Sequence, residues 1–535
     1  MRILTILVAT TLIGLSIGTV SAQEVDARKA LLASIDAMGA DDLQTIEYSG
    51  SGFSSRIGQQ YSVNGGWPTY QVVDYTRSID FDAGWSREDY TRQQGDYPLF
   101  GRTPMEPQRI TSIVNASYAW DIREDGSSNA LTRPYLDGIP YGELRQLEIA
   151  ITPHGFLKAA LAADDATAIS LPIVGASDIG VSQFGRQVTI VSFTFLNKYK
   201  INGTITDGNL VELVGTWIPN PVYGDMDYEM RYTRYREIDG VMFPMQLHTH
   251  QADPRLNFAH NYYQYDITNV TINGEVATIP VPDMVKTAVT STPVVESTEL
   301  ADGVWRIAGG SHHSLLVEFR DYVAIVEAPK NEARSLAVIA EANRLVPGKP
   351  IQYVINTHHH FDHAGGLRTY LSQGTTIVTH ESNKQYYLDI LFHPAPRTLQ
   401  PDRMSKFNPM FWISRRPAPI ETVDGDVRRT GKYVVTDGEQ ILEIIRVQDM
   451  AYELGDNSLR DGIHSEDMLI AYLPKEGILM NADLYSPRGE VVQDPTVGMR
   501  TLHENIKKLK LNVERHVPVH GGITTHKEFL EIIEG

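Results

Sequence analysis

The stretch Thr357-His358-His359-His360-Phe361-Asp362-His363-Ala364-Gly365-Gly366 carries four histidines and one carboxylate within six positions. A lone buried histidine is usually a hydrogen-bonded core residue, but four of them beside an aspartate are hard to explain by packing. Imidazole and carboxylate groups are ligands for divalent zinc, manganese or iron. The stretch therefore predicts a metal site.

The spacing within this motif predicts how its side chains divide between metal ions. In an extended loop His358 and His360 point the same way, so both can reach one ion. Asp362 and His363 follow the turn and can reach a second ion. His359 should point away from the metals, which predicts a structural role.

Strands alternate with helices around the motif. Residues 315–319 and 323–327 are predicted strands, and residues 332–345 have helical spacing. A buried strand is predicted over 351–356, directly before the motif, and a helix start over 365–371. This order places the motif at the carboxyl end of a strand, where α/β folds generally bind ligands.

The motif resembles the metal motif of the metallo-β-lactamase superfamily, in particular of its glyoxalase II-like hydrolases. The resemblance extends from about Ser291 to Gly535 and implies an αβ/βα sandwich. That family takes three further ligands from later strands. The corresponding residues here are His464 within 462–472, Asp483 within 477–483, and His520 within 517–522.

The resemblance implies seven ligands for two divalent ions, zinc in the first place and iron or manganese as alternatives. They are His358, His360 and His464 on one ion, Asp362, His363 and His520 on the other, and Asp483 shared by both. Glu327 stands where the family often has aspartate. The segment from Gln448 to His464 is longer than expected for the family and has the composition of a loop.

Two divalent ions about 3.5–4 Å apart can hold a water between them and lower its pKa to about 7. The resulting hydroxide would be the nucleophile, and Asp362 would orient it as the predicted catalytic residue. The expected activity is hydrolysis of an ester, thioester, lactone or amide-type small molecule. Two alternatives are an iron-dependent oxidoreductase of the same fold and a non-enzymatic envelope protein that binds lipid or protein.

Substrate-binding residues cannot be assigned from the sequence. Residues 388–430 are predicted to be an insertion over the mouth of the site, and they include Phe392, Phe407, Met410, Phe411 and Trp412. It is either an apolar lid or a segment that packs on another domain or subunit.

Outside the motif, histidines occur in two adjacent or near-adjacent pairs. His312 and His313 precede a predicted strand and are candidates for lining a pocket. His248 and His250 lie on one face of another predicted strand, where an exposed polar face is favoured over a metal pair.

The N-terminal half, from Glu47 to Val281, has a mostly β pattern. Short alternating runs, such as 187–193 and 228–235, end at turn residues, which predicts an antiparallel sheet with one buried face. Helices are predicted over 27–38 and near 155–163. The stretches Gly224-Asp225 and 240–244 are weakly similar to lipoprotein-carrier envelope domains, so this half is either a scaffold or a binder of amphiphiles.

The chain of 535 residues is therefore predicted to be α+β overall, with a mainly antiparallel β domain before the αβ/βα domain. The predicted boundaries are a signal peptide at 1–22, the β-rich domain at 23–285, a linker at 286–296 and the catalytic domain at 297–535. The signal peptide is indicated by Arg2, an apolar run over 3–17 and Val20-Ser21-Ala22. It predicts a periplasmic or secreted protein.

Composition limits the partners. The chain has no cysteine, which excludes disulfides, thiolate metal sites and cysteine nucleophiles. A formal net charge of −19 opposes binding to nucleic acid. No stretch after residue 22 is long and apolar enough to span a bilayer. A small-molecule substrate is expected, and the oligomeric state is left open.

Overall fold

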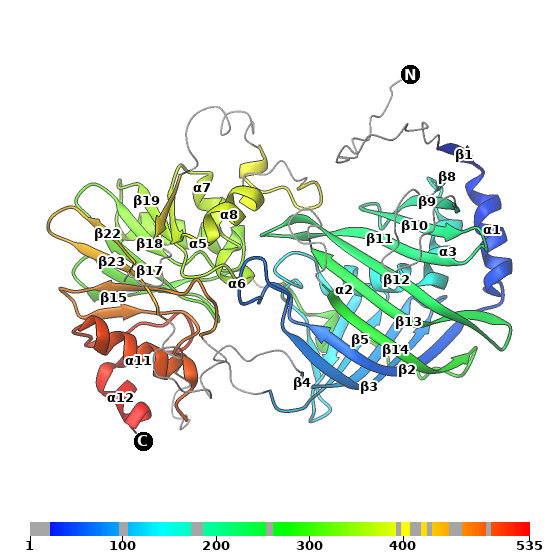
Figure 1. Cartoon of the computed structure of the whole chain (residues 1–535), viewed down its shortest axis with the longest axis horizontal. Helices are drawn as coiled ribbons and strands as arrows, with labels where there is room; N and C mark the ends of the chain where they lie inside the picture. Colours follow the sequence, from blue (N-terminus) through cyan, green and yellow to red (C-terminus); the bar gives the residue numbers. More distant parts are fainter. Residues whose placement is uncertain are drawn as a thin grey trace.

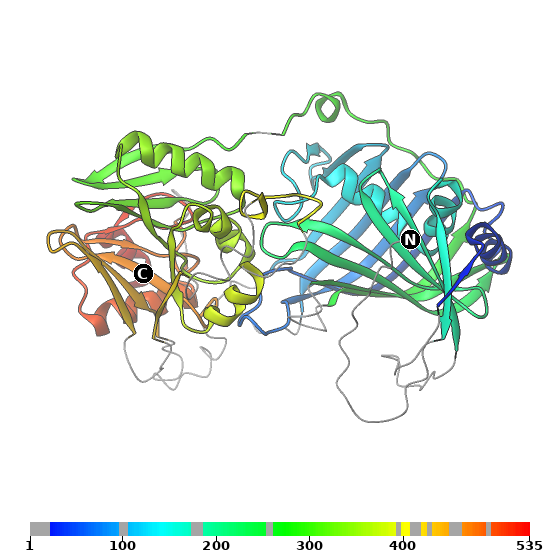
Figure 2. The ribbon, with the colours of Figure 1, turned by 90° about the horizontal axis from the view of Figure 1, so that it is seen from above.

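The computed structural model describes residues 22–95, 105–172, 186–252, 261–290, 292–391, 397–406, 419–424, 431–448, 463–487 and 494–534. They form two domains that lie side by side along the long axis of the molecule (Figures 1 and 2). The predicted signal peptide up to residue 21 and the five apolar side chains of the predicted lid lie outside the described ranges.

The N-terminal domain is built on one sheet of fourteen strands in the order β1-β8-β9-β10-β11-β12-β13-β14-β2-β3-β4-β5-β6-β7. Each neighbouring pair is antiparallel, which confirms the predicted antiparallel sheet. The strands are β1 (Gln23–Val25), β2 (Thr45–Ser55), β3 (Thr69–Asp80), β4 (Trp85–Gln94), β5 (Gln108–Asn115), β6 (Tyr118–Ile122), β7 (Ser128–Ala130), β8 (Thr167–Pro172), β9 (Gln187–Phe195), β10 (Tyr199–Thr206), β11 (Val211–Asn220), β12 (Gly224–Ile238), β13 (Val241–Ala252) and β14 (Asn261–Ile272).

Three helices pack against this curved sheet, with α1 at its far end (Figures 1 and 2). They are α1 (Ala27–Met38), α2 (Tyr141–Ala150) and α3 (Pro153–Ala162). The alternation of buried and less buried residues along β10 and β12 shows that one face of the sheet forms the core. Helix α1 has the bounds predicted from the sequence, because Asp26 caps its first turn and Gly39, with φ +61°, ends it.

The C-terminal domain contains two sheets. The first has the order β15 (Glu296–Ala301), β16 (Val304–Ala308), β17 (Ser314–Glu318), β18 (Val323–Val326), β19 (Ile351–Ile355), β20 (Thr376–His380) and β21 (Ile420–Val423). The second has the order β22 (Lys432–Thr436), β23 (Ile441–Arg446), β24 (Leu469–Leu473), β25 (Ile478–Met480), β26 (Arg515–His516) and β27 (Thr524–Thr525). Strands β18 to β21 run parallel to one another.

Helices cover the outer faces of both sheets (Figures 1 and 2). The first sheet carries α5 (Glu332–Leu345), α6 (Phe361–Ala364), α7 (Leu367–Leu371) and α8 (Asn383–Leu391), with a short 3-10 helix at Met404–Lys406. The second carries α11 (Val497–Leu509) and α12 (His526–Glu534). The domain is therefore the predicted αβ/βα sandwich.

Alternate residues of the central strands serve two different cores. Leu316 and Ile325 pack in the cluster that contains Val338 of α5. Leu315 and Val326, their neighbours in sequence, pack in the cluster that joins the two sheets. Because successive side chains of a strand point to opposite faces, such strands are apolar throughout and carry polar groups only at their ends.

The domains are joined by a short helix, α4 (Asp283–Lys286), and an extended segment that enters β15 at Glu296. They also contact each other directly. Arg397, buried in the second domain, donates hydrogen bonds to the carbonyl groups of Asn220 at the end of β11 and of Pro221 and Val222 in the turn that follows. Within the described residues, none of the helices is long and apolar enough to span a membrane.

Candidate metal centre

The histidine motif begins where β19 ends and runs into the one-turn helix α6. His358, His359, His360 and His363 are all fully buried. The Asn356 side-chain amide donates to the carbonyl of His358 at 2.7 Å, and Asp467 accepts the His359 backbone N–H at 2.8 Å. These bonds satisfy the backbone of a buried loop and hold its conformation.

The first group of histidines consists of His358, His360 and His464, whose candidate ligand nitrogens all lie within 4.8 Å of one another. Nδ1 of His360 lies 3.0 Å from Nε2 of His358 and 2.9 Å from Nε2 of His464. Burial lowers the pKa of His358 to about 4, which favours the neutral imidazole that binds metals. This donor set fits a divalent ion.

Asp483 lies between this group and a second one. Its Oδ2 is 3.4 Å from Nε2 of His358, 3.5 Å from that of His464 and 2.9 Å from that of His363. Its Oδ1 is 3.2 Å from Nε2 of His520. Burial alone would raise the pKa of Asp483, but the imidazoles of His464 and His363 hold it well below its usual value.

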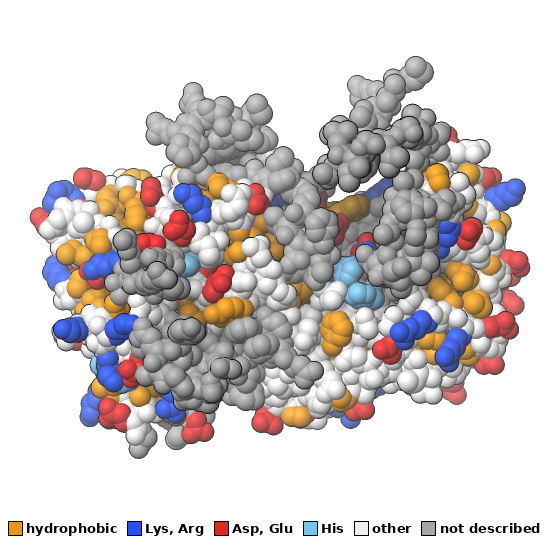
Figure 3. Space-filling model, in the orientation of Figure 1, with side chains coloured by type: hydrophobic (Ala, Val, Ile, Leu, Met, Phe, Trp, Pro, Cys, Tyr) orange, Lys and Arg blue, Asp and Glu red, His pale blue; other side chains and the backbone are white. Residues whose placement is uncertain are grey.

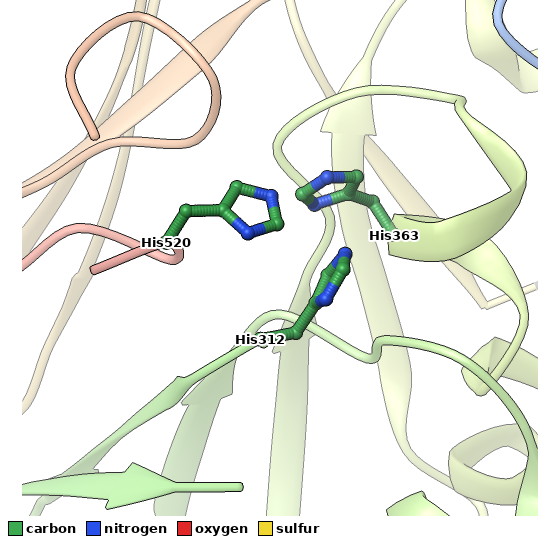
Figure 4. A group of neighbouring side chains, drawn as sticks. All are labelled: His312, His363 and His520. Atoms are coloured by element: carbon green, nitrogen blue, oxygen red, sulfur yellow. The ribbon is translucent and has the colours of Figure 1, made fainter. Parts of the chain in front are cut away.

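The second group consists of His312, His363 and His520, whose rings converge from the loop before β17, from helix α6 and from the loop after β26 (Figure 4). Asp362 adjoins it, with Oδ2 3.1 Å from Nε2 of His312 and 4.0 Å from Nε2 of His363. His312 is buried, and its position at a candidate ion was not predicted from the sequence. The only signal in the sequence was its place on the loop before β17.

Glu327 orients His363. The buried carboxylate accepts a 2.7 Å bond from Nδ1 of His363 and a 3.0 Å bond from the Thr357 backbone N–H. An Nδ1–H donated to Glu327 fixes the ring so that Nε2 of His363 is directed at Asp483 and the second group. Glu327 has a φ of +77°, so the strand end turns sharply to bring its carboxylate under the motif.

Residues 307–444 match the family model described as the Metallo-beta-lactamase superfamily. This segment is a metallo-β-lactamase superfamily domain. The chain is similar in structure to a metallo-beta-lactamase from Pontibacter korlensis, with 15% identity and a TM-score of 0.31 over 45% of this chain and 99% of that one. It is also similar to the mono-zinc form of the metallo-beta-lactamase FIM-1 from Pseudomonas aeruginosa, with 16% identity and a TM-score of 0.29 over 45% of this chain and 95% of that one. A metallo-beta-lactamase from Hirschia baltica has 18% identity and a TM-score of 0.30 over 45% of this chain and 95% of that one. No curated protein matches the chain.

The metallo-β-lactamase domain does not form its site alone, because a loop of the N-terminal domain after β2 packs on the motif. Nε2 of His360 lies 2.8 Å from the carbonyl of Gln60, and donation to it leaves the Nδ1 lone pair of His360 directed at the Nε2 atoms of His358 and His464. The Gln59 amide donates to Oδ1 of Asp362 at 2.8 Å. Gly58 is required here, since a Cβ would lie 2.3 Å from the Phe361 ring.

The predicted non-ligand histidines lie elsewhere. Nδ1 of His359 lies 3.0 Å from Asp467, away from both groups, in agreement with a structural role. His313 accepts a bond from the backbone N–H of Gly309 through Nδ1. His248 and His250 are half-buried on β13, where Nε2 of His248 lies 2.9 Å from the Asn261 side chain. Among the described residues, the C-terminal domain therefore brings all seven predicted ligands close together. His312 of the same domain joins the second group, and Gln59 of the N-terminal domain contacts Asp362.

Proposed function

We propose that this protein is an exported binuclear metal-dependent hydrolase that acts on an ester, thioester, lactone or amide-type small molecule. The superfamily fold of residues 307–444 supports metal-dependent hydrolysis in general. The observation that carries the two-metal assignment is the position of Asp483, whose two carboxylate oxygens face histidines of both groups.

In this proposal His358, His360 and His464 hold one ion, and His363, His520 and Asp362 hold the other, with Asp483 shared. Two such ions, when bound, supply an acidified water and polarise the substrate's carbonyl group. Nitrogen and oxygen donors fit zinc first, with iron or manganese as alternatives.

Asp362 has the geometry of a positioned proton acceptor. The Gln59 amide donates to Oδ1 at 2.8 Å, and Nε2 of His312 lies 3.1 Å from Oδ2, so the carboxylate is held from both sides. The Asp362 side chain is 25% exposed to solvent, whereas that of the neighbouring His363 is fully buried. Asp362 can therefore orient the attacking water and pass a proton to the leaving group.

A small-molecule substrate also agrees with the charge distribution. On the face shown in Figure 3, acidic and basic side chains are interspersed among the coloured residues, without a continuous basic surface of the kind that binds nucleic acid.

The test is a panel of ester, thioester, lactone, β-lactam and phosphodiester substrates with the metal-loaded full chain, with and without chelator. We expect about two metal equivalents per chain and chelator-sensitive hydrolysis that His360→Ala abolishes. His248→Ala, a histidine of the N-terminal sheet, is the matched control and should retain activity. A purified protein without transition metal, or full hydrolysis by His360→Ala, would show the proposal to be wrong. Redox-active iron with oxygen uptake would indicate the oxidoreductase instead.

Export has its own test. If residues 1–22 are cleaved, the mature protein recovered from the cell envelope or the medium begins at Gln23 by intact-mass measurement. Recovery of the uncleaved chain in the cytoplasm would contradict export.

A further inference from the structure

A cavity of about 340 Å³ lies between the two domains, beside the second histidine group. The N-terminal domain contributes Arg133 and Asp137, from the segment between β7 and α2. The metallo-β-lactamase domain contributes Ser311 from the loop before β17, Lys330 from the loop before α5 and Arg334 from the first turn of α5. Both domains are therefore needed to form it.

The cavity is positively charged in an acidic protein. Arg133, Lys330 and Arg334 line it, and Asp137 is the one acidic residue among its described lining residues. Nζ of Lys330 lies 3.8 Å from Asp137, so that pair is partly neutralised, which leaves the two arginines in excess. The whole chain has a formal net charge of −19, so this local excess of cations points to a bound anion.

Arg334 is the strongest feature of the cavity. It is 4% exposed, and among the described residues the guanidinium donates through Nη2 alone, to the carbonyls of His312 at 3.1 Å and Ile307 at 3.4 Å. Its Nε and Nη1 are buried without a hydrogen-bond acceptor among the described residues. Buried donors without acceptors are costly and rare, and a guanidinium binds an oxyanion through just such N–H groups.

The local backbone is arranged around this guanidinium. A Cβ at Gly309 would lie 2.6 Å from Nε of Arg334, so only glycine allows the side chain to lie there. Helix α5 begins at the same place, with Asn331 at its N-cap, and the positive end of its dipole adds to the field in the cavity.

The cavity wall continues into the second histidine group. The Ser311 carbonyl lies 2.7 Å from Nδ1 of His520, and its hydroxyl lies 2.9 Å from Nδ1 of His312. The backbone N–H of Lys330 donates to the carbonyl of Asp362 at 3.0 Å. An anion held by Arg334 would therefore be separated from the proposed reacting centre only by cavity-lining residues such as Ser311 and Lys330.

We propose that this cavity binds an oxyanion of the substrate, a carboxylate, sulfate or phosphate, so that the preferred substrates are anionic small molecules. This inference rests on the proposed hydrolase function. The oxyanion orients the substrate while its ester, lactone or amide group faces the metals.

The first experiment is calorimetric titration of the metal-loaded full chain with inorganic sulfate. We expect Arg133→Gln and Lys330→Gln together to weaken sulfate binding at least tenfold, and Arg334→Met to abolish it. Arg344→Gln, on the same helix but exposed and paired with Glu341, is the matched control and should bind as the wild type does. If Arg334→Met does not fold, the pair of substitutions at Arg133 and Lys330 still decides the result.

The second experiment compares two esters that differ only in one remote carboxylate. In the Arg133→Gln/Lys330→Gln protein we expect at least a tenfold higher KM for the anionic ester and no change for the neutral one. Unchanged sulfate binding and unchanged KM values would overturn the inference, while chelator-sensitive hydrolysis would leave the proposed function standing. If the double substitution weakens sulfate binding but leaves the KM of both esters at the wild-type values, the substrate assignment is overturned and a free oxyanion is indicated as the ligand. Absence of any hydrolysis would instead contradict the proposed function, and sulfate binding would still report on the cavity.

Discussion

The Gln59 side-chain amide donates a 2.8 Å hydrogen bond to Oδ1 of Asp362, a residue 303 positions further along the chain and in the other domain. The same loop places the carbonyl of Gln60 2.8 Å from Nε2 of His360, and the carbonyl of Tyr61 accepts the backbone N–H of Glu466 at 3.0 Å. The N-terminal domain therefore contributes residues to the candidate metal centre as well as lying next to it.

Substitution of Gln59 by alanine should lower kcat about tenfold with the metal content unchanged, because Asp362 loses one of the two groups that position it. Steady-state kinetics and metal analysis of the same preparation check this. Gln93→Ala, which removes an exposed amide bonded to Gln71, should leave kcat unchanged. Equal kcat values for the Gln59 variant and the wild type would mean that the bond from Gln59 to Asp362 does not contribute to catalysis.

Substitution of His312 by alanine should weaken one of the two metal sites about 10–100-fold, because its imidazole faces His363, His520 and Asp362. Metal titration followed by mass spectrometry of the bound ions measures the two sites separately. His313→Asn, the adjacent residue outside both groups, should retain two ions. A His312 variant with unchanged stoichiometry and affinity would make His312 a packing residue.

Glu327→Gln should also weaken metal binding by about 10–100-fold, because it removes the charged acceptor that orients His363. The loss should fall on the ion that His363 and Asp483 share. Glu318→Gln, which changes a half-exposed glutamate paired with Lys349, provides a control for loss of one negative charge. Wild-type affinity in the Glu327 variant would mean that burial alone orients the imidazole.

Metal removal should destabilise the full chain. A ligand that binds only the folded state at 100 times its Kd adds about 2.7 kcal/mol, which corresponds to several degrees of Tm. Differential scanning calorimetry before and after chelation, and again after zinc is restored, measures the change. The Tm of His360→Ala should change clearly less on chelation. A wild-type Tm that chelation leaves unchanged would argue against a metal-stabilised domain.

The N-terminal domain has a buried titratable group that makes its stability depend on pH. Burial, reinforced by Glu88, raises the pKa of Glu148 to about 7, against a usual value of 4.5. Arg77, Arg145 and the hydroxyl of Tyr228 act in the opposite direction. A raised pKa in the folded state stabilises the fold at low pH, and this contribution is lost as the pH rises from 4.5 through about 7.

The unfolding free energy of the wild type should therefore fall between pH 5 and pH 8 by about 2 kcal/mol more than that of Glu148→Gln. Denaturant titrations at both pH values measure it. Glu143→Gln, on the same helix, should keep the wild-type dependence because Glu148 is still present. Parallel pH profiles for wild type and Glu148→Gln would show that this carboxyl does not titrate in that range.

Much of the fold could be predicted from local patterns. The bounds that the sequence predicts for β17, β18, α5 and β19 agree with the structure within one residue at every end, because buried strands are continuously apolar and helices have a different period. Helix α2 was missed, since its two buried leucines and isoleucine are interrupted by charged and polar residues that bond to the sheet. Of the predicted lid, the described part contains residues 388–391, 397–406 and 419–424, so its role stays a prediction.

The sequence by itself determined the metal-binding pattern at 358–363, because ligands on one short loop are held close together by the covalent chain. Through the family resemblance it also indicated Asp483 and the distant histidines His464 and His520. Only the tertiary structure decided that Asp483 faces both groups, that His312 joins the second, and that Gln59 reaches Asp362 from another domain. These contacts join segments up to 303 positions apart. Their distances are set by how the two sheets and the interdomain loop pack, and no local pattern of residues records that.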